Sequence, residues 1–140
     1  AKLLNRMSFS SNNAAFKPNR TPYDWLTRDN TVVDAYIADP FCGFPLKVGG
    51  YRELFLGLKA LTKLHQLRMI PKDLPVLLMS GFDDPLAGED GGAIQTLAGQ
   101  YRAAGLTDIT VKLYAGARHE VFNETNREEV MNDLLAWLNK

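Results

Sequence analysis

The stretch LPVLLMSGFDDPLAGEDGG, residues 74–92, decides the fold. Its apolar run at residues 75–80 is bounded by Pro and Gly. This pattern is typical of a strand buried on both faces, and therefore of a parallel sheet. A polar, glycine-rich loop follows, and then a helix is predicted from about residue 92 to 104 with Gly105 as a left-handed cap at its end.

A second strand is predicted at residues 108–114. The order strand, helix, strand gives a right-handed crossover, which places the two strands parallel in one sheet with their C-terminal ends on the same side. The last helix is expected to begin near Thr125, which would form a capping box with Glu128. Its apolar stripe would consist of Val130, Met131, Leu134, Leu135 and Leu138.

The first fifty residues are rich in Asn, Ser, Pro and Gly and predict mostly irregular structure. One short helix is expected at about 30–38, capped by Asp29, and a longer amphipathic helix at 51–68. Aromatic residues are unusually dense in this part, and they form either a satellite core under long loops or the apolar wall of a ligand site. They are Phe16, Tyr23, Trp25, Tyr36, Phe41 and Phe44.

Composition excludes several classes of protein. The chain has 140 residues, the length of one domain, and its 16 basic and 16 acidic side chains give no net charge. A nucleic-acid binder or a protein of anionic membranes usually carries a basic excess, so neither is expected. We see no signal peptide, no transmembrane segment and no metal-type Cys/His spacing, and the single Cys42 fits a reducing, cytoplasmic setting. No cofactor is expected.

The candidate chemistry lies where the two strands end. Asp83 and Asp84 follow the first strand, and His119 follows the second, so all three are expected at the same edge of the sheet. A carboxylate beside an imidazole fixes the ring and stabilises the imidazolium that forms when the base takes a proton, classically from a Ser hydroxyl. The same spacing would also arise if these three were ordinary loop residues without a catalytic role. The other histidine, His65, lies on the flank of the apolar stripe predicted for residues 51–68 and is expected to be a solvated or boundary residue.

Together, LPVLLMSGFDDPLAGEDGG, VKLYAGARHEVFNE and the closing helix resemble the C-terminal end of an α/β-hydrolase. The resemblance is to the monoacylglycerol lipase, lysophospholipase and serine aminopeptidase group. It implies that Asp84, in the Gly-x-x-Asp of residues 81–84, is the catalytic acid and that His119, in the Gly-x-x-His of residues 116–119, is the base. It also implies a cap over the active site in residues 1–72 and the C-terminal part of the hydrolase core in residues 73–140. The fold expected is therefore α/β, with parallel strands, crossover helices and a mainly helical or irregular cap.

The nucleophile of that family is missing from this sequence. The family places its Ser in a Gly-x-Ser-x-Gly turn upstream of the cap, and no such motif occurs among Ser8, Ser10, Ser11 and Ser80. The backbone donors of the oxyanion hole would be absent too. We therefore expect the C-terminal half of a serine hydrolase acting on a lipid ester, with the Ser and the oxyanion hole on an N-terminal-half polypeptide. The isolated chain is expected to be inactive.

Two other interpretations remain. The chain could be a non-catalytic α/β module that binds a partner through its aromatic residues and an open sheet edge. It could also hold a metal ion with Asp83, Asp84, Glu89, Asp90 and His119, although a flexible loop with one His is a poor metal site.

Overall fold

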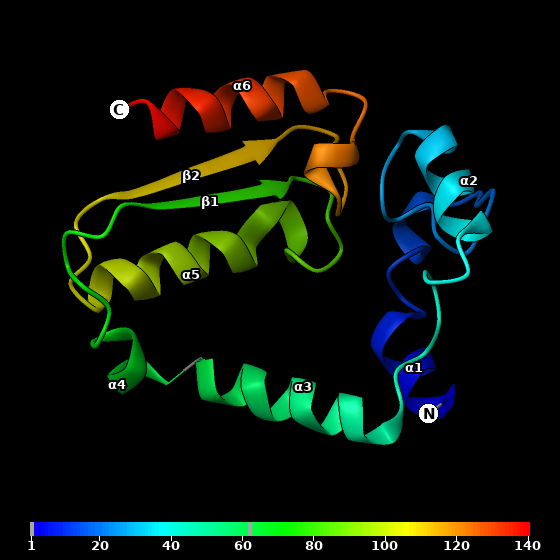
Figure 1. The fold of residues 1–140 in the computed structure, drawn as a ribbon, viewed down its shortest axis with the longest axis horizontal. Helices are drawn as coiled ribbons and strands as arrows, with labels where there is room; N and C mark the ends of the chain where they lie inside the picture. Colours follow the sequence, from blue (N-terminus) through cyan, green and yellow to red (C-terminus); the bar gives the residue numbers. More distant parts are fainter. Residues whose placement is uncertain (1, 62) are drawn as a thin grey trace.

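The structure is a computed structural model that describes residues 2–61 and 63–140. Within them the sheet has two parallel strands, β1 (Val76–Gly81) and β2 (Ile109–Tyr114), paired in register from Val76 opposite Ile109 to Gly81 opposite Tyr114. The helix α5 (Gly92–Ala103) connects them, as Figure 1 shows. Both predicted strands, their parallel pairing and the crossover helix are confirmed.

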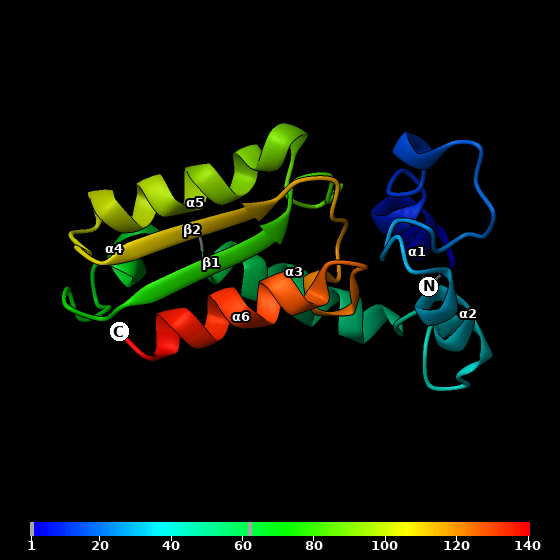
Figure 2. The same cartoon turned by 90° about the horizontal axis from the view of Figure 1, so that it is seen from above.

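Helices cover both faces of this sheet. α5 lies on one face and α6 (Arg127–Leu138) on the other, as the view from above in Figure 2 shows. The α6 side contains a core of Tyr114, Ala117, Val121 and Val130, with Met79 packed against it. A second core, between α5 and the short helix α4 (Leu64–Leu67), contains Leu67, Ala104 and Leu106. The described part of the chain is thus one portion of a three-layer α/β/α architecture.

The end of α5 shows why a glycine is needed there. Gly105 has φ +104°, its N–H donates to the carbonyl of Arg102, and the N–H of Leu106 donates to the carbonyl of Tyr101. These two bonds form a Schellman motif, which satisfies carbonyls that the helix leaves unpaired. The predicted left-handed cap at Gly105 is confirmed.

The burial predicted for β1 is wrong in part. Its first four residues, Val76–Met79, are half-buried, and only Ser80 and Gly81 are buried. β2 covers one edge of β1, and no described strand pairs with the other edge. The apolar run therefore has the composition of a central strand while standing at an edge of this sheet.

Residues before β1 form a mainly helical segment. It contains α1 (Lys2–Phe9), η1 (Ala14–Phe16), α2 (Asn30–Ala38) and α3 (Val48–Leu61). As predicted, the side chain of Asp29 caps α2 by accepting the N–H of Thr31 at 3.0 Å. The single helix predicted at 51–68 is wrong, because α3 begins at Val48 and ends at Leu61, and α4 is a separate turn. His65 in α4 is exposed, as expected.

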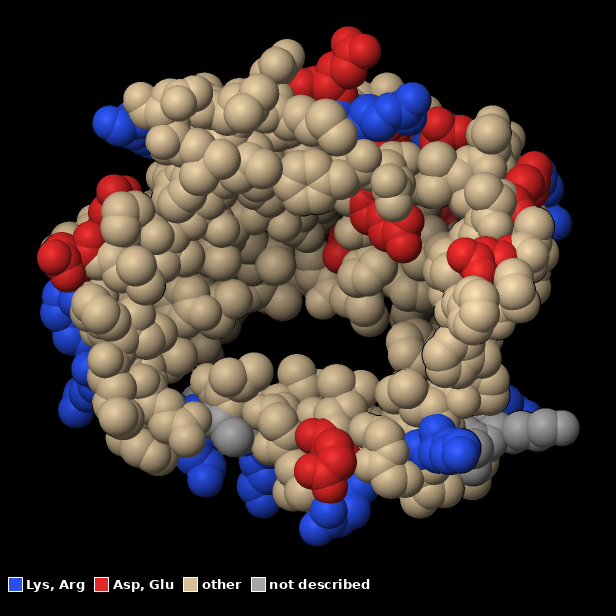
Figure 3. All heavy atoms as spheres, viewed as in Figure 1, with Lys and Arg blue, Asp and Glu red and all other residues tan. Residues whose placement is uncertain are grey.

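The apolar stripe of α3 has no cover in the described structure. Four of its side chains are exposed by 43% to 68%: Leu54, Phe55, Leu58 and Leu61. α3 lies away from the sheet, and Figure 3 shows an open passage between α3 and the layer of β1 and α5, surrounded mostly by uncharged residues. On α6, Met131, Leu135 and Leu138 of the predicted stripe are exposed as well. Such a large uncovered apolar surface is unusual for a protein that functions alone.

The predicted capping box of α6 is wrong. The helix begins at Arg127 with Asn126 as its N-cap residue, and no side chain caps it. The N–H of Thr125 donates to Glu124, and the side chain of Asn126 bonds Arg28 and Glu129 instead. These bonds, one of them from Arg28 far earlier in the chain, replace the predicted pairing of Thr125 with Glu128. The described helices contain no apolar segment of the length a bilayer crossing requires.

Candidate active site

His119 and Asp84 meet at the C-terminal ends of β2 and β1. Nδ1 of His119 lies 3.0 Å from Oδ2 of Asp84, and Oδ1 of Asp84 accepts the N–H of Leu86 at 2.9 Å. The carboxylate is buried, whereas the imidazole remains 36% exposed. The proximity expected from the sequence is confirmed. A carboxylate held on both oxygens can orient the imidazole and stabilise its protonated form.

Gly81 allows the two loops to approach each other. A Cβ at this position would lie 2.1 Å from the carbonyl oxygen of Arg118 and 2.2 Å from that of Ala117. The N–H of Asp83 donates to the same Ala117 carbonyl at 3.0 Å. The turn before His119 also needs a glycine, because Gly116 has φ +71°. These two glycines bring the acidic loop and the histidine loop into backbone contact.

Electrostatics at the pair favour a protonated imidazole. The hydrogen bond with Asp84 raises the pKa of His119 above its ordinary value of 6.5, and partial burial opposes this rise. Within the described residues, Nε2 of His119 has no hydrogen-bond partner. The ring is thus held through Nδ1, and Nε2 is the nitrogen that can exchange a proton with another group.

The neighbouring acidic residues take no part in this pair. Asp83 is exposed, and so are Glu89 and Asp90. Among the residues that the structure describes, no three His, Cys, Asp or Glu side chains are arranged to hold a metal ion. Asp84 is therefore the carboxylate that the fold directs at His119, which agrees with its choice over Asp83 from the Gly-x-x-Asp motif.

None of the four serines bonds to His119 within the described part of the chain. Ser80 is buried at the end of β1, where its hydroxyl donates to the carbonyl of Gly81 at 3.2 Å. Ser10 follows α1 and lines a pocket. The geometry thus brings a carboxylate and an imidazole together, and within the described residues no serine hydroxyl bonds to that imidazole.

Residues 24–28, far from His119 in sequence, form one wall of the site. The indole of Trp25 packs on the imidazole of His119, with 5.0 Å between ring centroids. The carbonyls of Trp25 and Leu26 accept the N–H groups of His119 and Glu120 at 3.4 and 2.8 Å. The guanidinium of Arg118 bonds the carbonyl of Asp24. This segment therefore sets both the surroundings and the backbone position of the base.

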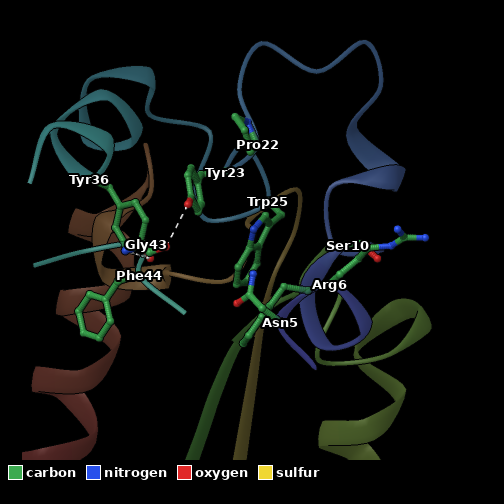
Figure 4. Close-up of a pocket in the computed structure, with 10 residues that line it drawn as sticks. Asn5, Arg6, Ser10, Pro22, Tyr23, Trp25, Tyr36, Gly43 and Phe44 are labelled. Carbon is green, nitrogen blue, oxygen red and sulfur yellow. Dashed lines mark hydrogen bonds between the residues drawn. The ribbon is translucent and has the colours of Figure 1, made fainter. Parts of the chain in front are cut away.

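Trp25 also lines a pocket, shown in Figure 4. Its volume is about 420 Å³, within the range of small-molecule sites. The hydroxyl of Tyr23 donates to the carbonyl of Gly43 at 3.3 Å, and that of Tyr36 accepts the N–H of Gly43 at 3.1 Å. The ten lining residues are Asn5, Arg6, Phe9, Ser10, Pro22, Tyr23, Trp25, Tyr36, Gly43 and Phe44.

The early aromatic residues divide between the two roles left open by the sequence. Tyr23, Trp25, Tyr36 and Phe44 line the pocket. Phe16 packs under the guanidinium of Arg118, which lies 4.1 Å from the ring centroid. Phe41 is 83% exposed and contributes to neither. Four of the six aromatic residues thus line one pocket, and one of these, Trp25, also contacts His119.

The arrangement of parallel strands, flanking helices and an acid–base pair at the strand ends defines an α/β-hydrolase fold. A solved structure supports this directly: a thermostable carboxyl esterase from Bacillus coagulans, in complex with glycerol, superposes with a TM-score of 0.83 at 21% identity. The match covers 99% of this chain and 45% of the esterase.

A family model described as serine aminopeptidase, S33, matches residues 1–126, and the chain belongs to this family. A monoacylglycerol lipase from Mycolicibacterium smegmatis is 29% identical over 117 residues, which cover 82% of this chain and 38% of the lipase. The chain therefore spans less than half the length of the curated relative and of the solved structure that it matches.

Sequence reasoning did not find every residue that builds the site. It placed Trp25 among the aromatics without assigning it a contact. It gave no role to Arg28, Arg118 and Glu124, whose bonds hold the histidine loop. The buried position of Glu124 has no local signal, because its charged partner, Arg28, lies almost a hundred positions earlier in the chain.

Proposed function

We propose that this chain supplies the acid and the base of a serine ester hydrolase whose nucleophile lies on an N-terminal-half polypeptide. The observation that carries the proposal is the 3.0 Å contact between Nδ1 of His119 and Oδ2 of Asp84 at the ends of two parallel strands. Membership of the serine aminopeptidase family and the resemblance to a lipase and an esterase support the same reaction class.

In this mechanism Nε2 of His119 takes the proton from the serine hydroxyl as its oxygen attacks the ester carbonyl. His119 then gives that proton to the departing alcohol, which leaves an acyl-enzyme. A water molecule, deprotonated by His119, releases the acid and restores the serine. Asp84 keeps Nδ1 of the imidazole protonated and stabilises the charge that the ring gains in each step.

A lipid ester is the proposed class of substrate. The pocket beside Trp25 exposes more apolar than polar surface, which suits an acyl chain better than a peptide. It lies in residues 1–72, the segment proposed as the cap, next to the candidate base. The names of the relatives, a lipase and an esterase, point to ester substrates as well.

The proposed partner would cover surfaces that this chain leaves open. A further strand would pair with the free edge of β1, and the apolar stripes of α3 and α6 would pack on the partner half. The coverage of the relatives supports this, since more than half of their length has no counterpart here. Without the partner the chain is expected to be inactive.

The first test is intact-mass analysis and N-terminal sequencing of every polypeptide in the purified sample. A second polypeptide with a Gly-x-Ser-x-Gly sequence, labelled by a fluorophosphonate probe and active on p-nitrophenyl esters, would support the proposal. Activity should be lost in His119→Gln. Finding this chain alone and monomeric, with no second polypeptide, would contradict it. That result would favour the binding module, whose supporting observation is the exposed stripe of α3.

A further inference from the structure

Glu124 is a buried carboxylate outside the acid–base pair. It belongs to the loop between η3 (Val121–Asn123) and α6, and its exposed fraction is 0%. A fully buried carboxylate is costly unless its oxygens are paired. It makes no contact with Asp84 or His119 that the structure records, so the proposed chemistry gives it no role.

Four donors saturate this carboxylate. Oε1 accepts the N–H of Arg118 at 2.8 Å and the N–H of Arg28 at 3.1 Å. Oε2 accepts Nε of Arg28 at 2.8 Å and the N–H of Thr125 at 3.0 Å. Burial alone would raise the pKa of Glu124, but these hydrogen bonds outweigh it and lower the pKa below 4.5. Glu124 is thus charged and joins three separate pieces of backbone.

One of the residues that Glu124 holds, Arg118, is the direct neighbour of His119. Arg118 is fixed at both ends, because its N–H bonds Glu124 while its guanidinium bonds the carbonyls of Asp24 and Thr27. His119 itself donates its N–H to the carbonyl of Trp25. The backbone on either side of the imidazole is therefore tied to residues 24–28.

Arg28 completes this arrangement. Besides its two bonds to Glu124, its Nη2 donates to Oδ1 of Asn126 at 2.7 Å. Its guanidinium also lies over the turn that leads to His119, since a Cβ at Gly116 would be 2.9 Å from Nη1. Arg28 thus contacts the turn before the base and, through Glu124 and Asn126, the loop after it.

We propose that Glu124, paired with Arg28, is a positioning residue that holds the loop of His119 so that the imidazole stays against Asp84 and Trp25. The reason is local. Without the carboxylate the N–H groups of Arg28, Arg118 and Thr125 would be buried without partners, and the loop would move to reach water. The expected effect of Glu124 on turnover rests on the proposed function, whereas its expected effect on the position of the His119 loop does not.

The test compares three variants of the full chain by NMR titration of the histidine ring protons. Glu124→Gln keeps the shape and removes the charge, Asp84→Asn removes the direct partner, and Asp133→Asn is the matched control. Asp133 is also a bonded carboxylate, held by Lys112 and Tyr114, but it lies on α6 away from His119. The chain has two histidines, so a His65→Gln variant assigns the His119 signal.

The pKa of His119 is expected to fall toward 6.5 in Glu124→Gln and in Asp84→Asn, and to stay unchanged in Asp133→Asn. An unchanged value in a folded Glu124→Gln would overturn the proposal. A fall of equal size in Asp133→Asn would also overturn it, since any loss of stability would then explain the shift. If Glu124→Gln does not fold, Arg28→Ala replaces it, because Arg28 is partly exposed, and the same outcomes apply.

Turnover gives the second measurement, made with the nucleophile-bearing partner present. Glu124→Gln is expected to lower kcat by about a hundredfold with little change in KM, because a base displaced by about 1 Å reacts poorly while the pocket is intact. A change in KM alone would overturn the positioning role. Absence of turnover in the unaltered protein would refute the proposed function, and the NMR titration would still decide the role of Glu124.

Discussion

Asp84 presents one carboxylate oxygen to Nδ1 of His119 at 3.0 Å and the other to the N–H of Leu86 at 2.9 Å. Both bonds are needed to fix the carboxylate, because a group held at one oxygen can still rotate. Asp84 is buried and His119 is partly open to solvent. This asymmetry suits the roles proposed for them, an orienting acid and a proton-transferring base.

Replacing Asp84 by Asn tests that relationship. The amide is the same size, but it cannot stabilise an imidazolium and it favours the wrong tautomer of His119. We expect kcat on p-nitrophenyl esters to fall by about three to four orders of magnitude when the nucleophile-bearing partner is present. The control is Asp83→Asn, an exposed carboxylate one residue away, which should leave kcat within about twofold. Equal losses in the two variants would contradict the assignment of Asp84.

The raised pKa of His119 has a predictable effect on rate. A general base must be neutral to accept a proton, so kcat/KM should fall as the pH drops through the pKa of His119. Since Asp84 raises this pKa above 6.5, the acidic limb of the profile should lie above pH 6.5 in the unaltered protein. Any residual activity of Asp84→Asn should show this limb at lower pH. A limb at the same pH in both proteins would argue against His119 as the base.

Stability should depend on pH through the same group. The pKa of His119 is higher in the folded chain than in the unfolded one. Its pairing with Asp84 is therefore fully stabilising below about pH 6.5 and is lost as the pH rises through the folded pKa. The imidazole is 36% exposed, so the loss should stay below about 1 kcal/mol. Urea midpoints at pH 5.5 and pH 9 measure it, and His119→Gln should remove the difference between them.

Gly81 offers a stability prediction with an internal comparison. In Gly81→Ala the new methyl group would meet two backbone carbonyls at 2.1 and 2.2 Å, and backbone cannot give way as a side chain can. We expect a loss of more than about 2 kcal/mol, together with displacement of the His119 loop. Gly57→Ala in the exposed middle of α3 has nothing within 4 Å and should gain about 0.5–1 kcal/mol. Urea denaturation of the two variants tests the loss of stability expected for Gly81→Ala and the gain expected for Gly57→Ala.

Much of the fold could be predicted from sequence because its signals are local. The apolar run before Gly81, the glycine at 105 and Asp29 before α2 each report a conformation of their own segment. The meeting of Asp84 with His119 followed from one topological rule, that parallel strands end on the same side. The Gly-x-x-Asp and Gly-x-x-His motifs then selected Asp84 over Asp83.

The parts of the fold and of the site that could not be predicted depend on contacts between residues distant in the sequence. Nothing near Glu124 in the sequence shows that Arg28 will neutralise it, and nothing near Thr125 shows that Asn126 will be the N-cap. The burial of β1 was misjudged for a related reason. Burial depends on what covers a surface, and the described chain contains no cover for Leu58 or for the free edge of β1.

The stripe of α3 gives the last prediction. At 100° per residue, Leu54 and Leu58 lie on the same side of the helix as Tyr51, which is buried and donates its hydroxyl to Asn5. That side faces into the molecule, and Leu56 lies roughly opposite. Leu58 and Leu56 are similarly exposed, at 52% and 47%, so either Leu→Glu change should alter the stability of this chain by less than about 0.5 kcal/mol.

Binding of the N-terminal-half polypeptide should distinguish Leu58→Glu from Leu56→Glu. Leu58→Glu places a charge in the proposed interface and should weaken binding of the N-terminal-half polypeptide at least about tenfold, since burying an unpaired carboxylate is costly. Leu56→Glu introduces the same charge on the far side and should bind as the unaltered chain does. Analytical ultracentrifugation or calorimetry with the partner measures this difference. Equal affinities for both variants would show that the partner half does not cover this stripe, and the uncovered leucines would then need a different occupant.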